Sequence, residues 1–462
     1  MANFRILDQF PALYSAAHPV QTGFRIFCQL VVRVFYRRFE VEGLERIPRS
    51  GPVILCANHP SALVDAVIIQ AVIPRIANPL ARSGLFRNPF LLPLLKIIQA
   101  VPIFRKEDQG ADTNRNTDSF VKCYERLGKG GLLLIFPEGV THADSRLKDF
   151  RTGAARLALG ALRINGRAPQ IIPVGLNFSD LGMFRSSVFI KVGKPLADIW
   201  QHPEESEEEA ARRITQSLRA AMVGVVLSTE SWEDQALLRR LDRFFALRTG
   251  KLKRRSLGQQ FRSQRKLAEA QYLLKREHPE LVARTQRHLS QFERLCGRIG
   301  VQDYHLSLDY SVGLVARYML RSLLILGVGV PLALWGGLNA FLPFLVTGSL
   351  AITFSKDLYH YDTAKILIGL VVFGAAWSAQ TLAVYALLGP GAAVVYGLSL
   401  APSAAMAQFM RKERRRLVDN IKAFFLFLRR RDLRTMLLEK RIQLERELAQ
   451  LTRLAYRSHG ER

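Results

Sequence analysis

The chain has 462 residues and a formal net charge of +27, with 66 Lys and Arg against 39 Asp and Glu. This length excludes a single ordinary hydrophobic core and predicts two or three structural units. The excess of positive charge favours an anionic partner, which could be nucleic acid, membrane headgroups or a phosphorylated substrate.

The first predicted element is a helix over residues 24–38, within an N-terminal region that covers residues 1–38. Five apolar residues recur there at helical spacing, with arginines between them: Phe27, Leu30, Val31, Val34 and Phe35. Such a basic amphipathic helix can lie in a membrane interface, but it can equally pack on its own domain. The preceding residues lack the charged-then-apolar order of a secretory signal, so we do not expect a secreted protein.

Residues 39–228 are predicted to form an α/β domain with a mixed sheet flanked by helices. Apolar runs rich in β-branched residues and bounded by Gly, Pro or polar residues are typical of strands. These runs cover residues 52–56, 131–136, 170–178 and 187–193. Helical patterns lie between them, over residues 60–73, 112–128 and 151–164. The alternation of strands and helices indicates the α/β class.

Residues 229–315 are predicted to form a helical insert with a basic face, because Lys and Arg alternate with Leu and Phe at helical spacing. A solvated helix surface is the plainer explanation of the same charges. In the region 316–410, residues 322–355 and 366–410 contain no Asp, Glu, Lys or Arg. About 20 helical residues cross a bilayer core of roughly 30 Å, so this region is predicted to be embedded in a membrane.

The two apolar runs differ in their interruptions. Gly389-Pro390-Gly391 divides the second run into two lengths that can each span. Pro331, Gly336-Gly337 and Pro343 interrupt the first run, which favours either a tilted span with an interfacial piece or a re-entrant hairpin. These helices are therefore expected to be transmembrane or re-entrant.

Residues 411–462 are predicted to form a charged C-terminal region. Its first six residues, RKERRR, predict that this end of the apolar region faces the cytoplasm. If the N-terminal domain is also cytoplasmic, the crossings are even in number, which favours a hairpin for at least one run. A single helix over residues 417–457 carries a leucine stripe that predicts packing or self-association. The stripe consists of Leu437, Leu438, Leu444, Leu448 and Leu451.

The four cysteines lie far apart in the chain: Cys28, Cys56, Cys123 and Cys296. Their spacing fits neither a zinc site nor a redox dithiol, so we expect reduced, mostly buried thiols in a cytoplasmic setting. No cluster of metal ligands is apparent, and no metal is expected.

His59 and Asp65, in the stretch ANHPSALVD, follow a predicted buried strand. Catalytic groups of open α/β sheets gather at such strand ends. If Ser61 caps the following helix, its first turn brings Asp65 back toward His59. An aspartate that accepts from one ring nitrogen leaves the other nitrogen basic, and such a pair can deprotonate a hydroxyl. The same spacing recurs at His202 and Glu208, so context carries the prediction, and a histidine that only caps its own turn is the alternative.

A second candidate, Phe136-Pro137-Glu138-Gly139, also follows a predicted strand. A glutamate in a sharp Pro/Gly turn at the rim of a sheet can accept hydrogen bonds from a polyol or can orient a loop. Taken alone, these residues predict a turn more strongly than a site.

Four blocks occur in the order NHPSALVD, VPIFRKE, FPEGVTH and IIPVGLNF. Together they resemble the glycerophosphate and lysophospholipid acyltransferase superfamily, over roughly residues 30–200. These membrane enzymes move a fatty acyl chain from a thioester to a glycerol hydroxyl. Five residues, instead of the commoner four, separate His59 and Asp65, and Thr141-His142 follows the glutamate block. Both features resemble a subgroup of this superfamily. The subgroup contains glycerol-3-phosphate and dihydroxyacetone-phosphate acyltransferases with their bacterial relatives, and also 1-acylglycerol-3-phosphate acyltransferases.

The resemblance implies a role for each matching residue. His59 would be the general base, with Asp65 as the residue that orients it. Arg105, in VPIFRKE, would contact the substrate phosphate, and Glu138 and Gly139 would form the acceptor-binding turn. Val140-Thr141 stands where the family usually has Thr-Arg, so an arginine is missing here. Three further basic residues are candidates for substrate binding: Arg82, Arg151 and Lys148, of which the last two could supply the missing charge.

The resemblance further implies an integral membrane enzyme of phospholipid synthesis whose catalytic domain faces the cytoplasm. Its acyl donor would be acyl-CoA or acyl carrier protein, and its acceptor glycerol 3-phosphate or lysophosphatidic acid, with no cofactor. The expected partners are membrane lipids and these substrates, with self-association through the C-terminal helix as an option. A catalytically inactive lipid-binding scaffold is the main alternative. A nucleic-acid partner is not expected, because the chain has long apolar runs and no aromatic-basic motif.

Overall fold

The computed structural model describes residues 19–460, except 90, 105–115, 182, 198, 201–204, 249–254, 302, 307–311 and 355–357. The chain divides into two compact units. The first unit holds the chain up to Gln235 together with Ser256–Arg262 and Ser355–Ile366. The second unit holds Ala236–Arg255, Ser263–Phe354 and Leu367–Arg462.

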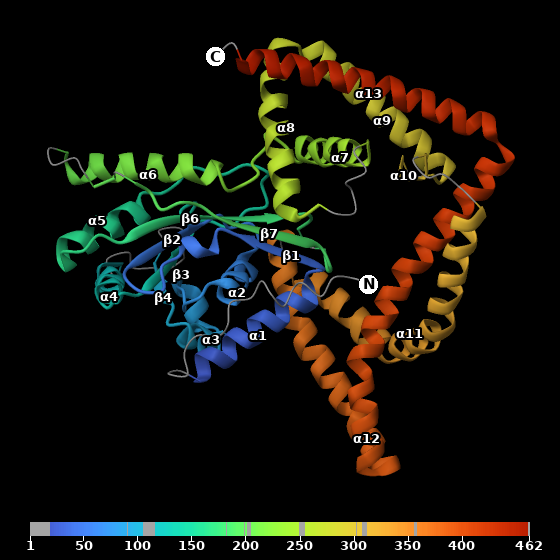
Figure 1. The fold of residues 1–462 in the computed structure, drawn as a ribbon. Coiled ribbons are helices and arrows are strands. Elements are labelled where there is room, and N and C mark those ends of the chain that lie inside the picture. The colour runs from blue at the N-terminus through green and yellow to red at the C-terminus, as the bar shows by residue number, and fades with distance from the viewer. Residues whose placement is uncertain are drawn as a thin grey trace. The chain divides into compact units, whose positions relative to one another are not determined.

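The first unit contains a seven-stranded sheet in the order β1-β7-β6-β2-β5-β3-β4 (Figure 1). Neighbouring strands are parallel except β6 and β7, which are antiparallel. The strands are β1 (Arg38–Glu42), β2 (Val53–Ala57), β3 (Asn78–Arg82), β4 (Val101–Ile103), β5 (Leu132–Ile135), β6 (Gln170–Phe178) and β7 (Ser187–Val192). This mixed sheet confirms the predicted fold class. The four predicted apolar runs form β2, β5, β6 and β7, whereas β1, β3 and β4 are not predicted.

Helices cover both faces of the sheet (Figure 1). They are α1 (Pro19–Phe35), α2 (Ala62–Val72), the short α3 (Leu92–Ile97), α4 (Asn116–Gly128), α5 (Gly153–Asn165) and α6 (Glu207–Val223). Two 3-10 turns, η2 (Leu44–Arg46) and η3 (Ser83–Arg87), lie between the strands. The helical patterns expected at 60–73, 112–128 and 151–164 correspond to α2, α4 and α5.

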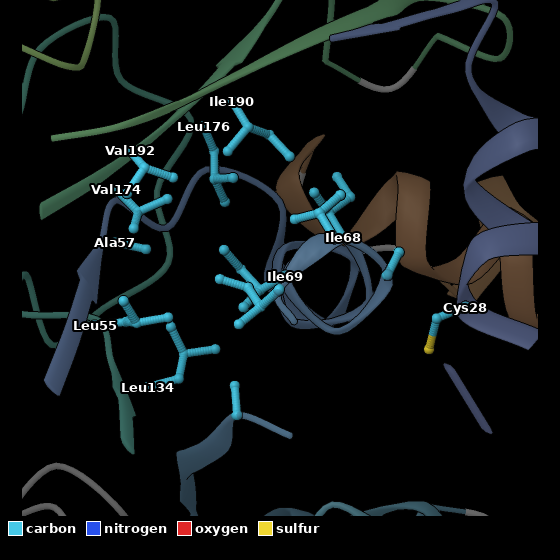
Figure 2. Close-up of a cluster of buried hydrophobic side chains, with 14 of the residues drawn as sticks. Cys28, Leu55, Ala57, Ile68, Ile69, Leu134, Val174, Leu176, Ile190 and Val192 are labelled. Atoms are coloured by element: carbon cyan, nitrogen blue, oxygen red, sulfur yellow. The ribbon is translucent and has the colours of Figure 1, made fainter. Parts of the chain in front are cut away.

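Alternate residues of β2 belong to two different cores, because successive side chains of a strand point to opposite faces. Leu55 and Ala57 pack with α1 and α2, and Cys56 packs with α4, α5 and α6. Figure 2 shows the side of the sheet that carries Leu55 facing Ile68 and Ile69 of α2. Since β2 is buried on both faces, its end is held firmly in the middle of the sheet.

Helix α1 satisfies both interpretations of its amphipathic pattern. One side packs on α2, where the buried Arg25 donates to the main-chain oxygens of Gln70 and Ile73, near the last turn of α2. The opposite side leaves an apolar stripe exposed, which includes Ile26 (50%), Leu30 (56%) and Val34 (54%). The helix therefore packs on its own domain and also carries an apolar surface that is open to a partner.

Most of the described residues after α6 are helical, as predicted for residues 230–300. The helices are α7 (Trp232–Arg248), α8 (Leu257–Glu277), α9 (Pro279–Ile299), α10 (Asp303–Leu306), α11 (Val312–Phe354), α12 (Leu358–Arg429) and α13 (Arg431–Gly460). The single helix predicted over residues 417–457 is wrong, because α12 ends at Arg429 and α13 begins at Arg431. The sequence has no Gly or Pro at this break. Leu437, Leu444 and Leu448 of the stripe are buried in a core with Leu289 and Phe292 of α9, so α13 takes its direction from packing on α9.

Two stretches are long and apolar enough to cross a membrane, Gly329–Phe354 in α11 and Thr363–Arg411 in α12. Their apolar side chains are widely exposed, as at Leu338 (76%) and Leu387 (82%). Helix α12 is interrupted at Gly389, whose φ of 82° and ψ of 178° are not helical. The predicted division at Gly389-Pro390-Gly391 is therefore confirmed, and Figure 1 shows the chain reversing direction there.

Candidate active site

The site begins at the carboxyl end of β2, where Asn58 and His59 follow the strand. The Asn58 side chain donates to the Leu176 oxygen of β6 (3.0 Å) and accepts from the Leu176 N–H (2.7 Å). Both hydrogen bonds are buried and join this turn to the neighbouring strand. The main chain that carries His59 is thus fixed at the carboxyl end of the central strand β2, where the sequence predicts a catalytic group.

His59 and Asp65 lie in direct contact. His59 Nδ1 is 2.9 Å from Asp65 Oδ2, and the same oxygen accepts the Ser61 N–H at 2.8 Å. The Asp65 side chain is fully buried, whereas the His59 side chain remains 14% exposed. With the Nδ1 proton donated to the carboxylate, the lone pair of the imidazole lies on Nε2. The pair therefore has the geometry of a general base and its orienting acid.

The turn between His59 and α2 is strained. Ala62, the first residue of α2, has a φ of +46°, which is unusual for a residue with a side chain. Ser61 is the N-cap residue, but its side chain makes no capping hydrogen bond, contrary to the sequence expectation. The Asp65 carboxylate instead accepts the Ser61 N–H, so the acid that orients the histidine also closes the turn.

Burial dominates the electrostatics of Asp65. It raises the pKa of the Asp65 carboxyl above its usual value, and the hydrogen bonds from His59 and Ser61 oppose the rise. The negative charge of Glu138 raises the pKa further. Within the described residues, Asp65 Oδ1 has no hydrogen-bond partner, so the carboxylate is satisfied on one oxygen only.

The ring of His59 is held on its face as well as at Nδ1. It stacks on Phe136, with ring centroids 3.9 Å apart and an angle of 16° between the planes. Phe136 directly follows β5, which is hydrogen-bonded to β2 in the sheet. The ring thus has two restraints, the Asp65 carboxylate in its plane and the Phe136 ring on its face.

Glu138 lies next to His59 and is 3% exposed. Its Oε1 accepts the His59 N–H at 3.2 Å, and its Oε2 accepts the Lys148 N–H at 3.1 Å. Glu138 Oε2 is also hydrogen-bonded to His142 Nε2. The structure therefore joins the first and third sequence blocks through one buried carboxylate.

Arg151 lies against the turn at Gly139. Gly139 has a φ of +71°, and a Cβ there would come within 2.7 Å of the Arg151 Nε. The Arg151 N–H donates to the Pro137 oxygen at 2.8 Å. In contrast, the Lys148 ammonium is 3.3 Å from Asp144 Oδ2, so its charge is paired within the loop. Of the two candidates for the missing charge, Arg151 is the one whose side chain packs on the Glu138-Gly139 turn.

Arg82, a further basic candidate, lies toward the β4 end of the sheet. Arg82 is the last residue of β3 and is paired in register with Ile103 of β4. Its side chain is exposed. Arg105 lies outside the described residues, so the structure gives no geometry for it.

Several residues of the site have no role in the sequence interpretation. His142 appears there only as part of a subgroup pattern, and Asn58 and Phe136 only as letters of the blocks. The spacing of four between Glu138 and His142 is the signal that could have found the His142 contact, but the chain is not helical there. The stacking of Phe136 depends on the adjacency of β2 and β5, which strand order along the chain does not reveal.

The four cysteines are free and buried, as predicted. Burial raises the pKa of the Cys56 thiol, on β2 near the site, to about 12. A thiol with such a pKa has almost no thiolate at neutral pH, so Cys56 is no nucleophile. Among the described residues, no group of three or more His, Cys, Asp or Glu side chains is arranged to hold a metal ion.

Residues 38–177 match the family model described as Acyltransferase. The chain is 27% identical to the chloroplastic 1-acyl-sn-glycerol-3-phosphate acyltransferase LPAT1 of Arabidopsis thaliana, over 29% of this chain and 36% of the relative. It is 29% identical to glycerol-3-phosphate O-acyltransferase 2 of Saccharomyces cerevisiae, over 22% of this chain and 15% of the relative. It is also 29% identical to the 1-acyl-sn-glycerol-3-phosphate acyltransferase of Borreliella burgdorferi, over 36% of this chain and 65% of the relative.

The chain thus spans about a third of the length of the Arabidopsis relative and less than two thirds of the other curated relatives named above. Among solved structures, it is similar to the 1-acyl-sn-glycerophosphate acyltransferase PlsC from Thermotoga maritima, with a TM-score of 0.33 and 18% identity. That match covers 47% of this chain and 86% of the other. The four sequence blocks, the His59–Asp65 pair and the family model all fall in the same part of the chain. The similarity to acyltransferases therefore lies in residues 38–177, the part of the chain that holds the His59–Asp65 pair.

Proposed function

We propose that this chain is a membrane-bound acyltransferase of phospholipid synthesis. It transfers a fatty acyl group from acyl-CoA or acyl carrier protein to a hydroxyl of glycerol 3-phosphate or lysophosphatidic acid. The observation that carries the proposal is the 2.9 Å contact between His59 Nδ1 and the fully buried Asp65 carboxylate at the carboxyl edge of the sheet. The names of the relatives, which are acyltransferases acting on these two acceptors, support the same reaction.

In this mechanism His59 acts as a general base through Nε2. It takes the proton of the acceptor hydroxyl as that oxygen attacks the thioester carbonyl, and Asp65 stabilises the imidazolium that forms. The tetrahedral intermediate then collapses, the C–S bond breaks, and His59 returns the proton to the leaving thiolate. Atoms and charge balance without a covalent enzyme intermediate, in keeping with a site whose neighbouring thiol is buried and protonated.

Binding of the acceptor phosphate is assigned to the basic residues of the site. We assign the main contact to Arg151, because its side chain packs on Gly139 beside the glutamate turn. A guanidinium offers two parallel donors to a phosphate, which an ammonium such as that of Lys148 does not. Arg82, the last residue of β3, and Arg105 are proposed as the second cationic contact.

The identity of the acceptor is proposed from the His-to-Asp spacing. The gap of five residues, which is similar to the glycerol-3-phosphate subgroup, favours glycerol 3-phosphate over lysophosphatidic acid. Lysophosphatidic acid offers the same phosphate with one hydroxyl already acylated, so both acceptors fit the same cationic contacts. The assay below distinguishes them.

We place the catalytic domain on the cytoplasmic side of a membrane that α11 and α12 enter as integral helices. The exposed apolar side chains of these helices need an apolar solvent, and the basic residues 411–416 follow the last apolar stretch. The exposed stripe of α1 is proposed to contact a lipid surface. Self-association through the C-terminal helix is not favoured, because the leucine stripe that suggested it packs on α9 within the second unit.

The test is an acyl transfer assay on purified membranes with labelled acyl-CoA or acyl carrier protein and either acceptor. The wild type should acylate glycerol 3-phosphate, and His59→Ala should lose at least about 100-fold in rate, since positioned acid–base groups contribute 10²–10⁴-fold. His278→Ala is the matched control, because His278 is an exposed histidine at the start of α9. Activity that survives in His59→Ala would favour the inactive-scaffold alternative, in which any transfer comes from another protein.

A further inference from the structure

We propose that Glu138 and His142 are positioning residues that hold the main chain of His59, and that Glu138 does not bind the acceptor. This inference rests on the proposed function, because it concerns how the base of that reaction is placed. It assigns to His142, which has no role in the sequence interpretation, a part in catalysis that acts through Glu138 and His59.

The first observation is that one short segment holds both sides of the His59 residue. The Glu138 Oε1 accepts the His59 N–H at 3.2 Å, and the His142 N–H donates to the His59 oxygen at 3.3 Å. Both hydrogen bonds come from residues 138–142, the turn that follows β5. The position of the catalytic ring therefore depends on the shape of this turn as well as on β2.

The second observation is that the Glu138 carboxylate is nearly saturated by protein donors. It accepts the N–H groups of His59 and Lys148 and the hydrogen bond to His142 Nε2, and it is 3% exposed. A carboxylate has about four acceptor positions, so three are already used. A group placed in this way orients a loop, whereas a ligand for a polyol hydroxyl needs accessible oxygens.

The third observation concerns the ring of His142. Its Nδ1 accepts the Asp144 N–H at 3.2 Å, which places the ring hydrogen on Nε2, where it donates to Glu138. The His142 side chain is 9% exposed, so water does not readily replace this donor. His142 therefore fixes the rotamer of Glu138, and Glu138 in turn fixes the main chain of His59.

The experiment compares three His142 variants in the same assay. His142→Gln keeps an N–H donor at the reach of Nε2, His142→Asn keeps only the shorter group at the level of Nδ1, and His142→Ala removes both. We expect His142→Asn and His142→Ala to lose roughly 10- to 100-fold in kcat, because small misplacements of a reacting group cost about that much. KM for donor and acceptor should stay within about threefold, and His142→Gln should recover most of the rate.

A matched control is His288→Ala, which removes a histidine bonded to a glutamate, Glu447, in the second unit. Its rate should equal that of the wild type. Glu138→Gln completes the test: a lower kcat at constant acceptor KM supports the inference, whereas a raised acceptor KM at constant kcat overturns it. A normal kcat in His142→Asn, or no difference between His142→Asn and His142→Gln, also overturns it. A wild type that transfers no acyl group under any condition refutes the proposed function instead.

Discussion

Asp65 combines two requirements that oppose each other. The proposed mechanism needs an ionised carboxylate beside His59, but the side chain is fully buried and one of its oxygens has no hydrogen-bond partner within the described residues. Burying an incompletely satisfied charge destabilises a fold. The strained φ of Ala62 in the same turn adds to this local cost. Such conflicts between stability and activity are common at functional sites.

A variant at this position should separate stability from activity. Burial raises the pKa of Asp65 in the folded state, so the protonated form stabilises the fold and this stabilisation is lost as the pH rises through the folded-state pKa. At pH 7 the free energy of unfolding of Asp65→Asn should therefore exceed that of the wild type by on the order of 1 kcal/mol, and the variant should unfold at a higher temperature. The difference should shrink as the pH falls through the folded-state pKa, because the wild-type carboxyl then becomes protonated as well.

Thermal unfolding of the purified protein in detergent, with transfer activity measured in parallel, tests this prediction. Asp65→Asn should be more stable and nearly inactive. Asp149→Asn, at a side chain that is 98% exposed, should change neither property. If Asp65→Asn unfolds at a lower temperature than the wild type at pH 7, the charge of Asp65 stabilises the fold and the prediction is wrong.

At the residue scale, the sequence predicts the His59–Asp65 contact because His59 lies in the turn before α2 and Asp65 lies in the first turn of that helix. Local geometry suffices there. The contacts of Glu138 with His59 and of Phe136 with the His59 ring join two strands, and the sequence does not say that β2 and β5 are neighbours. The same limit applies to Arg151, whose packing on Gly139 depends on the path of the loop between β5 and α5.

At the scale of elements, the sequence predicts the centre of the sheet and misses its edges. The predicted strands β7, β6, β2 and β5 are consecutive in the sheet, and the missed strands β1, β3 and β4 lie at its two ends. Central strands are covered on both faces and are therefore continuous apolar runs. The missed strands are only partly buried, and β4 has three residues, so neither composition nor length distinguishes them from loops.

Helices α11 and α12 approach each other closely at Gly336. A Cβ on Gly336 would come within 2.0 Å of the Ser403 main chain, whereas a Cβ on Gly337 would meet no atom within 4 Å. A polar cluster lies nearby in the same unit, in which Asn339 accepts from the Tyr396 hydroxyl and from the Gln380 amide. Small residues at a helix crossing and side-chain hydrogen bonds between helices are the typical contacts of membrane helices.

Two neighbouring glycines therefore offer a matched pair of variants. Gly336→Val should separate α11 from residues 390–411 of α12. It should lower the free energy of unfolding of the detergent-solubilised protein by roughly 1–3 kcal/mol, as for overpacked cores. Gly337→Val adds the same side chain to the same helix but on an open side, so it should have little effect. Equal loss in both variants would mean that helix propensity, not the crossing, determines the effect.

At the scale of the whole molecule, charge and hydropathy together predict the membrane topology. Because Gly389 divides α12, the apolar part of the chain has three arms, in residues 329–354, 363–388 and 390–411. Three full crossings would put the catalytic domain and the basic residues 411–416 on opposite sides, against the charge rule. We therefore propose an even number of crossings, in which the two arms of α12 cross as a hairpin and α11 enters the membrane without crossing it fully.

Cysteine labelling in intact cells tests this topology. A cysteine at Pro390, at the turn of α12, should react with a membrane-impermeant thiol reagent added from outside. Cysteines at Trp232, in the first unit, and at Arg414, after the apolar region, should react only after the membrane is opened. The native cysteines are buried and should give a low background. External labelling at Arg414 would indicate an odd number of crossings.

The first helix has a mechanical consequence for how the domain meets a lipid surface. The guanidinium of Arg25 donates to the main-chain oxygens of Gln70 and Ile73, near the end of α2. If α1 detached from the domain, these buried carbonyl groups would lose their hydrogen bonds, which is costly. Helix α2 carries Asp65 at its other end. If the exposed stripe of α1 binds a bilayer, the packing of α1 on α2 fixes the distance between His59 and the lipid surface. The fold would then determine how far from the membrane the thioester of the acyl donor has to lie.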